Sequence, residues 1–227
     1  MDRNLVSYSP ILQRPQLRWP NSARVALWVV PALEWFPLNM KGAPFKPPGA
    51  MVTAYPDFRH YTLRDYGNRV GVYRVAKALA QHGITATAAV NAAVAARYPA
   101  LLEHCTQWGW EVIANGLDMD HLHHAGLARE DEAKLIEQTL AVLRKASGQP
   151  VKGWLSPAKS QSGATLELLA QSGLDYCCDW VNDDMPYLMH AGGRELVAMP
   201  HPCDVDDYTI LINNHRSEEH TSELQSP

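Results

Sequence analysis

Short apolar runs alternate with amphipathic segments along most of this chain, and this alternation restricts the folds open to it. Continuous apolar runs are typical of buried strands, whereas apolar residues at helical spacing indicate helices. Strands are expected at residues 24–30, 85–90, 110–114, 153–155, 175–178, 196–199 and 209–212, and helices at 66–82, 92–108, 130–147 and 165–172. The pattern predicts an α/β fold with a mostly parallel sheet and helical crossovers. A barrel and an open sheet both satisfy it.

The composition fits one globular domain that acts on a small molecule. The chain has 227 residues, 46% of them hydrophobic and 19% charged, which is enough for a substantial core. The net charge is -4 without a basic block, so nucleic acid and anionic membranes are disfavoured as partners. No apolar run is long enough to span a bilayer, and no secretory signal is recognisable at the N-terminus. We therefore expect a small-molecule substrate and a cytoplasmic location, and leave a homo-oligomer open.

Four cysteines are present, and they do not form a recognisable framework. Cys105, Cys177, Cys178 and Cys203 lack the spacing of a zinc finger. The adjacent pair Cys177 and Cys178 is also poorly suited to anchor disulfides. Free thiols in a reducing compartment are the simplest interpretation.

The two ends of the chain differ in composition from its middle. Residues 1–23 are polar and contain prolines, as expected of an N-terminal surface segment. Residues 24–215 carry the alternating pattern and form the expected domain. Residues 216–227 lack an apolar period and look like a translated sequencing adapter, so we expect an artefactual tail on a truncated domain. The proline-rich stretch 35–64 is long for a loop, and we expect it to act as a lid over the site.

Polar side chains follow most of the predicted strands. They are Glu34, Asn91, Asn115 with Asp118, Ser156 with Lys159, and Asp179 with Trp180. In a (β/α) barrel the carboxyl ends of the strands meet at one mouth, where active sites are built. The alternative is that each is an ordinary polar loop residue or helix cap. That alternative explains single residues more easily than it explains the whole set.

Three segments resemble the polysaccharide deacetylase superfamily, also described as NodB homology or as similar to carbohydrate esterase family 4. They lie at 177–187, where Asp179-Trp180 is followed by Asp183 and Asp184, at 153–157 and at 66–71. More narrowly, the chain resembles the allantoinase-like branch, over roughly 24–215. The resemblance implies an incomplete (β/α) barrel of about seven strands.

The chain departs from the metal-dependent members of that superfamily at three motif positions. Their first strand ends in two aspartates, a base and a metal ligand, where this chain has Leu33 and Glu34. Asn115 stands in place of a ligand histidine, and an amide is a poor zinc ligand. Leu155 replaces an arginine that orients the base. The allantoinase-like branch also lacks the full metal set and is regarded as cofactor-independent, so we expect no cofactor and disfavour zinc.

A histidine-rich loop follows the third predicted strand. If a metal is bound, the ligands expected are Glu34, Asp118 and His121. The favoured alternative is a solvated loop with one functional histidine, because His123 and His124 lack the spacing of metal ligands on a periodic element.

The resemblance and the strand-end pattern together give the candidate site. Trp180 is expected to line the groove, although core packing is its alternative role, and Asp183 has turn capping as its alternative. The expected acid histidine of the family falls near Asn213-Asn214-His215. The candidate catalytic residues are Glu34, Asp179, His201 and Asn115, and the candidate substrate contacts are Trp35, Asn91, Asp118, His121, Trp154, Trp180, Asp183 and Asp207.

The function expected is hydrolysis of a carbon–nitrogen bond other than a peptide bond, in a small cyclic amide or ureide. Glu34 and Asp179 would orient a water, with one of them as general base, and Asn115, His121 or His201 would stabilise the oxyanion. One alternative is a metal-dependent deacetylase of an N-acetyl sugar in carbohydrate metabolism. Another is a non-catalytic ligand-binding relative, which Leu33 and Leu155 favour and the carboxylates near Trp180 oppose.

Overall fold

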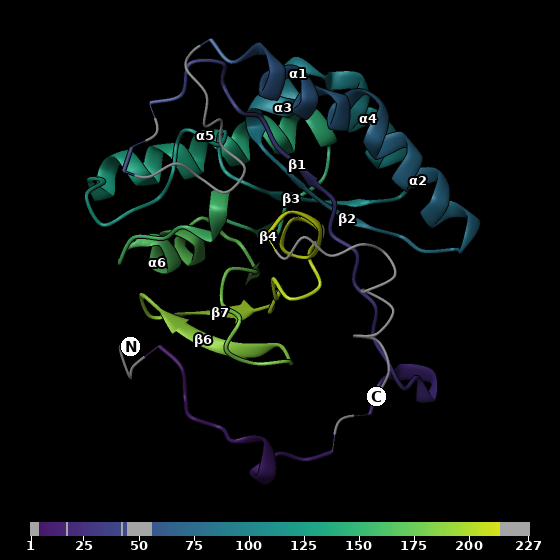
Figure 1. The fold of residues 1–227 in the computed structure, drawn as a ribbon. Coiled ribbons are helices and arrows are strands. Elements are labelled where there is room, and N and C mark those ends of the chain that lie inside the picture. The colour runs from purple at the N-terminus through teal and green to yellow at the C-terminus, as the bar shows by residue number, and fades with distance from the viewer. Residues whose placement is uncertain (1–4, 17, 42, 45–55, 214–227) are drawn as a thin grey trace.

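Seven strands form one sheet in the computed structural model, which describes residues 5–16, 18–41, 43–44 and 56–213 (Figure 1). The strand order is β1-β2-β3-β4-β5-β7-β6, and the pairs are parallel except β6 with β7. The strands are β1 (Ala32–Leu33), β2 (Thr87–Val90), β3 (Glu111–Ala114), β4 (Gly153–Trp154), β5 (Tyr176–Cys177), β6 (Tyr187–Ala191) and β7 (Arg194–Ala198). β1 pairs with β2 alone among the described strands, so the sheet does not close.

Helices connect the parallel strands, as the alternating pattern predicts. Figure 1 shows them around the outside of the curved sheet. The α-helices are α1 (Phe58–Tyr66), α2 (Val72–Gln81), α3 (Ala92–Arg97), α4 (Pro99–Gln107), α5 (Arg129–Ser147) and α6 (Thr165–Gln171). Short 3-10 or π-helical turns are η1 (Ile11–Gln13), η2 (Pro20–Ser22), η3 (Gly67–Gly71), η4 (Pro157–Lys159) and η5 (Tyr208–Asn213). None of the helices in the described ranges has the length and apolarity of a membrane span.

The sheet has an apolar core on each face, because side chains alternate along a strand. Ala88 and Val90 of β2 belong to the large core beneath the helices. Ala89 between them belongs to a smaller core on the inner face, together with Ile113 of β3 and Cys178 after β5. Both faces are therefore buried in the middle of the sheet, which explains why its strands are continuously apolar.

The first strand lies later in the chain than its apolar run predicts. Val25 and Leu27 are 77% and 71% exposed and belong to no strand. The backbone joins the sheet only from Val29, whose carbonyl accepts from Thr87 at 3.0 Å. Pro31 does not end the ladder, because its carbonyl still accepts from Ala89 at 3.0 Å and what proline lacks is only the N–H donor.

Two further predictions at the C-terminal end of the sheet were wrong. Residues 209–212 belong to η5, a π-helix, rather than to a strand. The strand β6 was missed, although Gly192 and Gly193 between two alternating runs are a hairpin signal.

The expected helix at 66–82 is confirmed as η3 and α2, but α1 precedes it inside the stretch that was predicted to be a loop. The predicted tail, 216–227, lies outside the described residues, as does part of the predicted lid.

Candidate active site

The polar residues that follow the strands lie along one edge of the sheet. Glu34 follows β1, Asn91 follows β2, Asn115 follows β3, Ser156 follows β4 after one residue, and Asp179 follows β5 after one residue. Strands β1 to β5 are mutually parallel, so all five residues lie at the carboxyl ends of their strands. These residues therefore share one end of the fold.

Glu34 is the centre of a charged and polar cluster at this edge. Burial raises the pKa of the Glu34 carboxyl, and Asp206 raises it further. The Asn115 amide and the Arg64 guanidinium act in the opposite direction and lower that pKa. Asn68 donates its Nδ2–H to the backbone carbonyl of Glu34 at 3.2 Å and thereby fixes the end of β1. The carboxyl is thus held close to two groups that can donate hydrogen bonds.

Several atoms around Glu34 have no hydrogen-bond partner among the described residues. They are Nε of Arg64, both Nδ2 and Oδ1 of Asn115, and Nδ1 of His201, and all of these atoms are buried. Asn115 is only 1% exposed, although its amide faces Glu34 closely enough to change the pKa of that carboxyl. Buried polar atoms are normally paired, and an unpaired one in a native fold requires an explanation such as a bound water or ligand. Such atoms make this cluster the candidate binding site.

Asn91 supports the site from below and does not face it. Its side chain is completely buried, accepts from the backbone N–H of Trp35 at 2.7 Å and donates to the backbone carbonyl of Asn115. It therefore ties the ends of β1 and β3 together. The expectation that Asn91 contacts substrate is corrected: it positions Trp35 and Asn115.

Trp35 remains at the rim of the cluster as a half-buried aromatic side chain. The Arg97 guanidinium lies 4.1 Å from the centre of its ring, and Tyr61 and Tyr98 pack edge-on against it. These contacts fix the indole in one orientation beside Glu34 in the chain.

Asp179 is held by several donors at once. Its Oδ1 accepts from the Ser156 N–H at 2.7 Å, and its Oδ2 accepts from Gln161 Nε2 at 2.6 Å and from the Cys177 thiol at 3.4 Å. Gln161 in turn accepts from Trp180 Nε1 at 3.0 Å. Burial raises the pKa of Asp179, and these hydrogen bonds lower it. Asp179 therefore ties the loops after β4 and β5 together, and Gln161 is a residue of this site that the sequence did not reveal.

His201 lies on the far side of the cluster, after β7. Burial lowers the pKa of its imidazole, the Lys159 ammonium lowers it further, and Asp206 raises it. Lys159 donates from Nζ to the His201 carbonyl and to Cys203 Sγ, the latter at 3.1 Å. The imidazole packs edge-on against Trp28, with 5.8 Å between ring centres. A neutral imidazole with a free Nδ1 is suited to accept or donate one hydrogen bond at the site.

The loop after β3 forms a local turn. Asp118 Oδ1 accepts from the backbone N–H groups of Asp120 and His121, at 2.9 and 3.1 Å, and lies 2.7 Å from His121 Nδ1. This contact with Asp118 raises the pKa of His121 despite its burial. Both side chains are thus engaged with each other, which is the pattern of a capped turn.

The residues at the site do not fit a divalent metal. Within the described residues, no group of three or more His, Cys, Asp or Glu side chains could hold an ion, so Glu34, Asp118 and His121 are not assembled as a ligand set. His123 is instead buried against Glu132, with 3.0 Å between Nδ1 and Oε1. The groups that shift the pKa of Glu34 are the Asn115 amide, the Arg64 guanidinium and the Asp206 carboxyl, and of these the guanidinium cannot ligate a cation.

Other predicted substrate contacts lie away from Glu34. Trp154 is completely buried and donates from Nε1 to Ser156 Oγ at 2.8 Å, so the prediction that it touches substrate is corrected. Asp183 pairs with Arg14 of the N-terminal segment, with 2.7 Å between Nη1 and Oδ1, which lowers the pKa of that carboxyl. Asp207 is exposed on the loop before η5. Asn214 and His215 lie outside the described residues.

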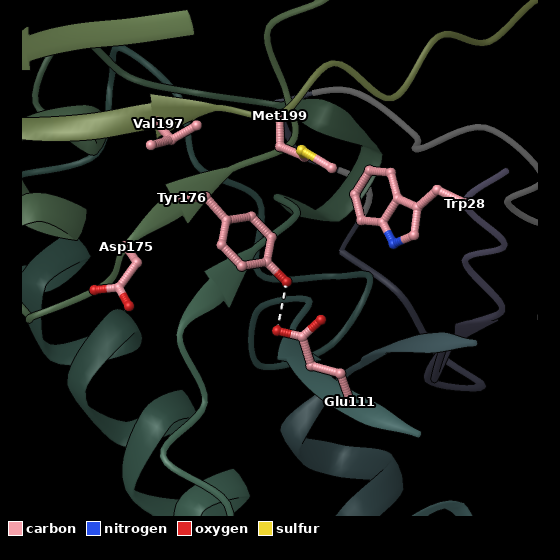
Figure 2. A pocket seen from close by; sticks show the side chains of 6 residues that line it. All are labelled: Trp28, Glu111, Asp175, Tyr176, Val197 and Met199. Carbon is pink, nitrogen blue, oxygen red and sulfur yellow. Dashed lines mark hydrogen bonds between the residues drawn. The ribbon is translucent and has the colours of Figure 1, made fainter. Parts of the chain in front are cut away.

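Of the cavities formed by described residues, two stand out, and Glu34 does not line either of them. A cavity of about 260 Å³ lies near the amino ends of the strands, where Figure 2 shows Tyr176 donating to Glu111 across 2.7 Å. A groove of about 960 Å³ separates the N-terminal segment from the loop before β6 and includes Trp180 and Asp183. Trp180 was expected to share a cavity with Glu34 and Asn115, but the groove that it lines contains neither of them.

Comparison with known proteins identifies the fold. This chain superposes on the Puue allantoinase with a TM-score of 0.73 at 23% identity, over 89% of this chain and 71% of that one. A Mycobacterium smegmatis protein assigned as a polysaccharide deacetylase gives 0.66 at 22% identity, over 85% and 64%. A Pseudomonas aeruginosa PAO1 protein with the same assignment gives 0.73 at 21% identity, over 86% and 69%. These matches confirm the expected incomplete (β/α) barrel.

The family follows from the sequence rather than from these superpositions. This chain spans between 64% and 71% of the length of the three solved chains. No curated protein sequence matches it. The sequence profile described as polysaccharide deacetylase, however, matches residues 60–177, which is just over half of the chain. The chain therefore belongs to the polysaccharide deacetylase family of hydrolases.

Proposed function

We propose that the cluster around Glu34 hydrolyses a carbon–nitrogen bond other than a peptide bond, in a small cyclic amide or ureide. The observation that carries this proposal is the set of buried atoms without full hydrogen bonds on Arg64 and Asn115, beside the Glu34 carboxyl. An amide substrate offers a carbonyl oxygen and an N–H group, and both need partners of this kind. The fold neighbour named Puue allantoinase supports the substrate class.

Glu34 is the proposed general base. It takes a proton from water while the water oxygen forms a bond to the carbonyl carbon. The C–N bond then breaks with its electron pair on nitrogen, and Glu34 returns the proton to that nitrogen. The products are a carboxylic acid, which ionises, and an amine or amide. The raised pKa of the Glu34 carboxyl suits both halves of this proton transfer.

Asn115 is the proposed donor to the oxygen that becomes negative in the transition state. Its buried amide faces the Glu34 carboxyl closely enough to lower the pKa of that group, and neither amide atom makes a full hydrogen bond among the described residues. A preorganised donor in a buried site is worth about 3 kcal/mol of transition-state stabilisation. His201, whose lowered pKa keeps its imidazole neutral, is a second group able to contact the substrate.

Asp179 is not the proposed base, because its two carboxyl oxygens already accept hydrogen bonds from Ser156, Gln161 and Cys177. A base must accept a proton from water, and the three donors around Asp179 take three of its about four lone-pair sites and lower the pKa of the carboxyl. We propose that no metal takes part, because the Asn115 amide is a poor metal ligand and the cationic Arg64 offsets the attraction of the Glu34 and Asp206 carboxyls for a divalent ion.

The proposal is tested by assaying the purified protein against a panel of cyclic ureides and N-acetyl sugars, each with and without a chelator. We expect ring opening of at least one cyclic ureide, unchanged by the chelator. Release of acetate from an N-acetyl sugar that stops with the chelator would instead establish the metal-dependent alternative. Binding of a ureide without turnover would establish the non-catalytic one.

A further inference from the structure

Arg64 lies on the side of helix α1 that faces the end of strand β1. Asn68 follows it by four residues, which places the two side chains on one face of a continuous helical segment. Asn68 Nδ2 donates to the Glu34 carbonyl at 3.2 Å, so this face is in contact with the end of β1. Arg64 therefore projects toward Glu34 from helix α1, whereas the other candidate residues follow strands.

The Arg64 guanidinium is fixed but not fully satisfied. It lies 3.8 Å from the centre of the Phe36 ring, a buried side chain two residues beyond Glu34. Its Nε–H is buried and has no hydrogen-bond partner among the described residues. The guanidinium is also close enough to Glu34 to lower the pKa of that carboxyl. Arg64 and Asn115 thus both act on the Glu34 carboxyl, and each has a buried polar atom without a full hydrogen bond among the described residues.

We infer that Arg64 binds the carbonyl oxygen of the substrate and, after hydrolysis, the carboxylate of the product. This inference rests on the proposed function, because it assigns a role within the same site. Guanidinium groups match the planar geometry of a carboxylate, and hydrogen bonds between ions are stronger than neutral ones. Arg64 and Asn115 would then donate to the reacting oxygen from two sides, while Glu34 acts on water.

The inference also explains how product leaves. Once Glu34 has returned its proton to nitrogen, its carboxylate and the product carboxylate are neighbours of like charge. Arg64 offsets part of that repulsion and the remainder favours release. A substrate with an uncharged carbonyl group does not meet this repulsion. A carboxylate, in contrast, is held most tightly when Glu34 carries no charge.

Acetate is a simple carboxylate probe that tests this role without turnover. The full chain is titrated with sodium acetate at constant ionic strength, and binding is followed by the rise in unfolding temperature and by acetate line broadening in NMR spectra. We expect saturable binding by the unchanged protein and a loss of about tenfold or more in affinity for Arg64→Gln. Arg64→Lys, which keeps the charge and loses the fork, is expected to fall between them.

Two further variants complete the design. Arg59→Gln removes the same charge from an exposed position on α1 and is expected to bind acetate as the unchanged protein does. Glu34→Gln removes the competing carboxylate and is expected to bind acetate at least as tightly. Absence of saturable binding, or equal affinity in Arg64→Gln and Arg59→Gln, overturns the inference. If Arg64→Gln does not fold, as judged by circular dichroism, the comparison of Arg64→Lys with Arg59→Gln decides. Turnover that survives in Glu34→Gln would refute the proposed function while leaving the acetate result to stand by itself.

Discussion

Replacing Glu132 by alanine should strongly destabilise the fold, although this residue lies outside the candidate site. Glu132 is fully buried on α5 and accepts from the hydroxyl groups of Ser162 and Thr165, while its Oε1 lies 3.0 Å from His123 Nδ1. Alanine removes the acceptor of the buried His123 and Thr165 side chains and of the half-buried Ser162 hydroxyl. Each buried group that loses its partner costs about 1–3 kcal/mol, so the loss of these three contacts is expected to cost about 3–5 kcal/mol.

The assay is denaturant unfolding followed by far-UV circular dichroism at neutral pH, with thermal unfolding as a second measure. For a domain of this size, a loss of about 3–5 kcal/mol lowers the unfolding temperature by about 6–20 °C. Glu132→Gln keeps one acceptor and should lose about 1–2 kcal/mol. Glu130→Gln, an exposed change in the same helical turn, should cost less than about 0.5 kcal/mol.

The pH dependence of this difference follows from the pKa of Glu132. Burial acts to raise that pKa, but the hydrogen bonds with His123, Ser162 and Thr165 outweigh it and lower the pKa below 4.5. The carboxylate therefore contributes stability above the unfolded pKa, and that contribution is lost as the pH falls through the folded value. The gap between the unchanged protein and Glu132→Gln should narrow in acid. An alanine variant within about 1 kcal/mol of the unchanged protein would refute this account of the network.

Two more predictions concern the site and its support. Gly116 has φ +66°, and a Cβ added there would lie 2.3 Å from Pro157 Cγ, so Gly116→Ala should lower the free energy of unfolding by about 2–4 kcal/mol. Gly83 has φ +65° but open space around it, so Gly83→Ala should cost only about 1–2 kcal/mol. Equal unfolding free energies for the two variants would show that the contact with Pro157 is unimportant. Glu34 can act as a base only when the pH is above its raised pKa, so kcat/KM should rise with pH through a value above 4.5. A kcat/KM that falls over that range would show that Glu34 acts as an acid instead.

The parallel part of the sheet could be predicted from sequence because its strands are buried on both faces. Residues 88–90 and 112–114 are apolar without interruption and buried, which leaves little choice of structure. The run at Val25 and Leu27 is equally apolar but is exposed, so hydrophobicity alone misplaced the first strand. β6 was missed because it is not a continuously apolar strand in the middle of the sheet. It pairs with one strand only, β7, and on its other side the backbone N–H of His190 donates to the carbonyl of Leu5.

The candidate site could be predicted only as far as residues that follow strands. Glu34 and Asn115 were found because each interrupts an apolar run at its carboxyl end. Arg64 was not found, since the surrounding prolines suggested a loop and concealed the helix that carries it. One of the hydrogen bonds to the Asp179 carboxylate comes from Gln161, eighteen residues earlier in the chain, and no local sequence pattern predicts that contact.

The central claim is that Glu34, and not Asp179, is the base. The measurement is kcat/KM of Glu34→Gln and Asp179→Asn on the best substrate of the panel, after circular dichroism has shown that both variants are folded. The account predicts a loss of about 10²–10⁴-fold for Glu34→Gln, because a general base contributes about that much, and a smaller loss for Asp179→Asn, which still offers one acceptor to Ser156. A larger loss in Asp179→Asn, with substantial activity left in Glu34→Gln, would contradict it.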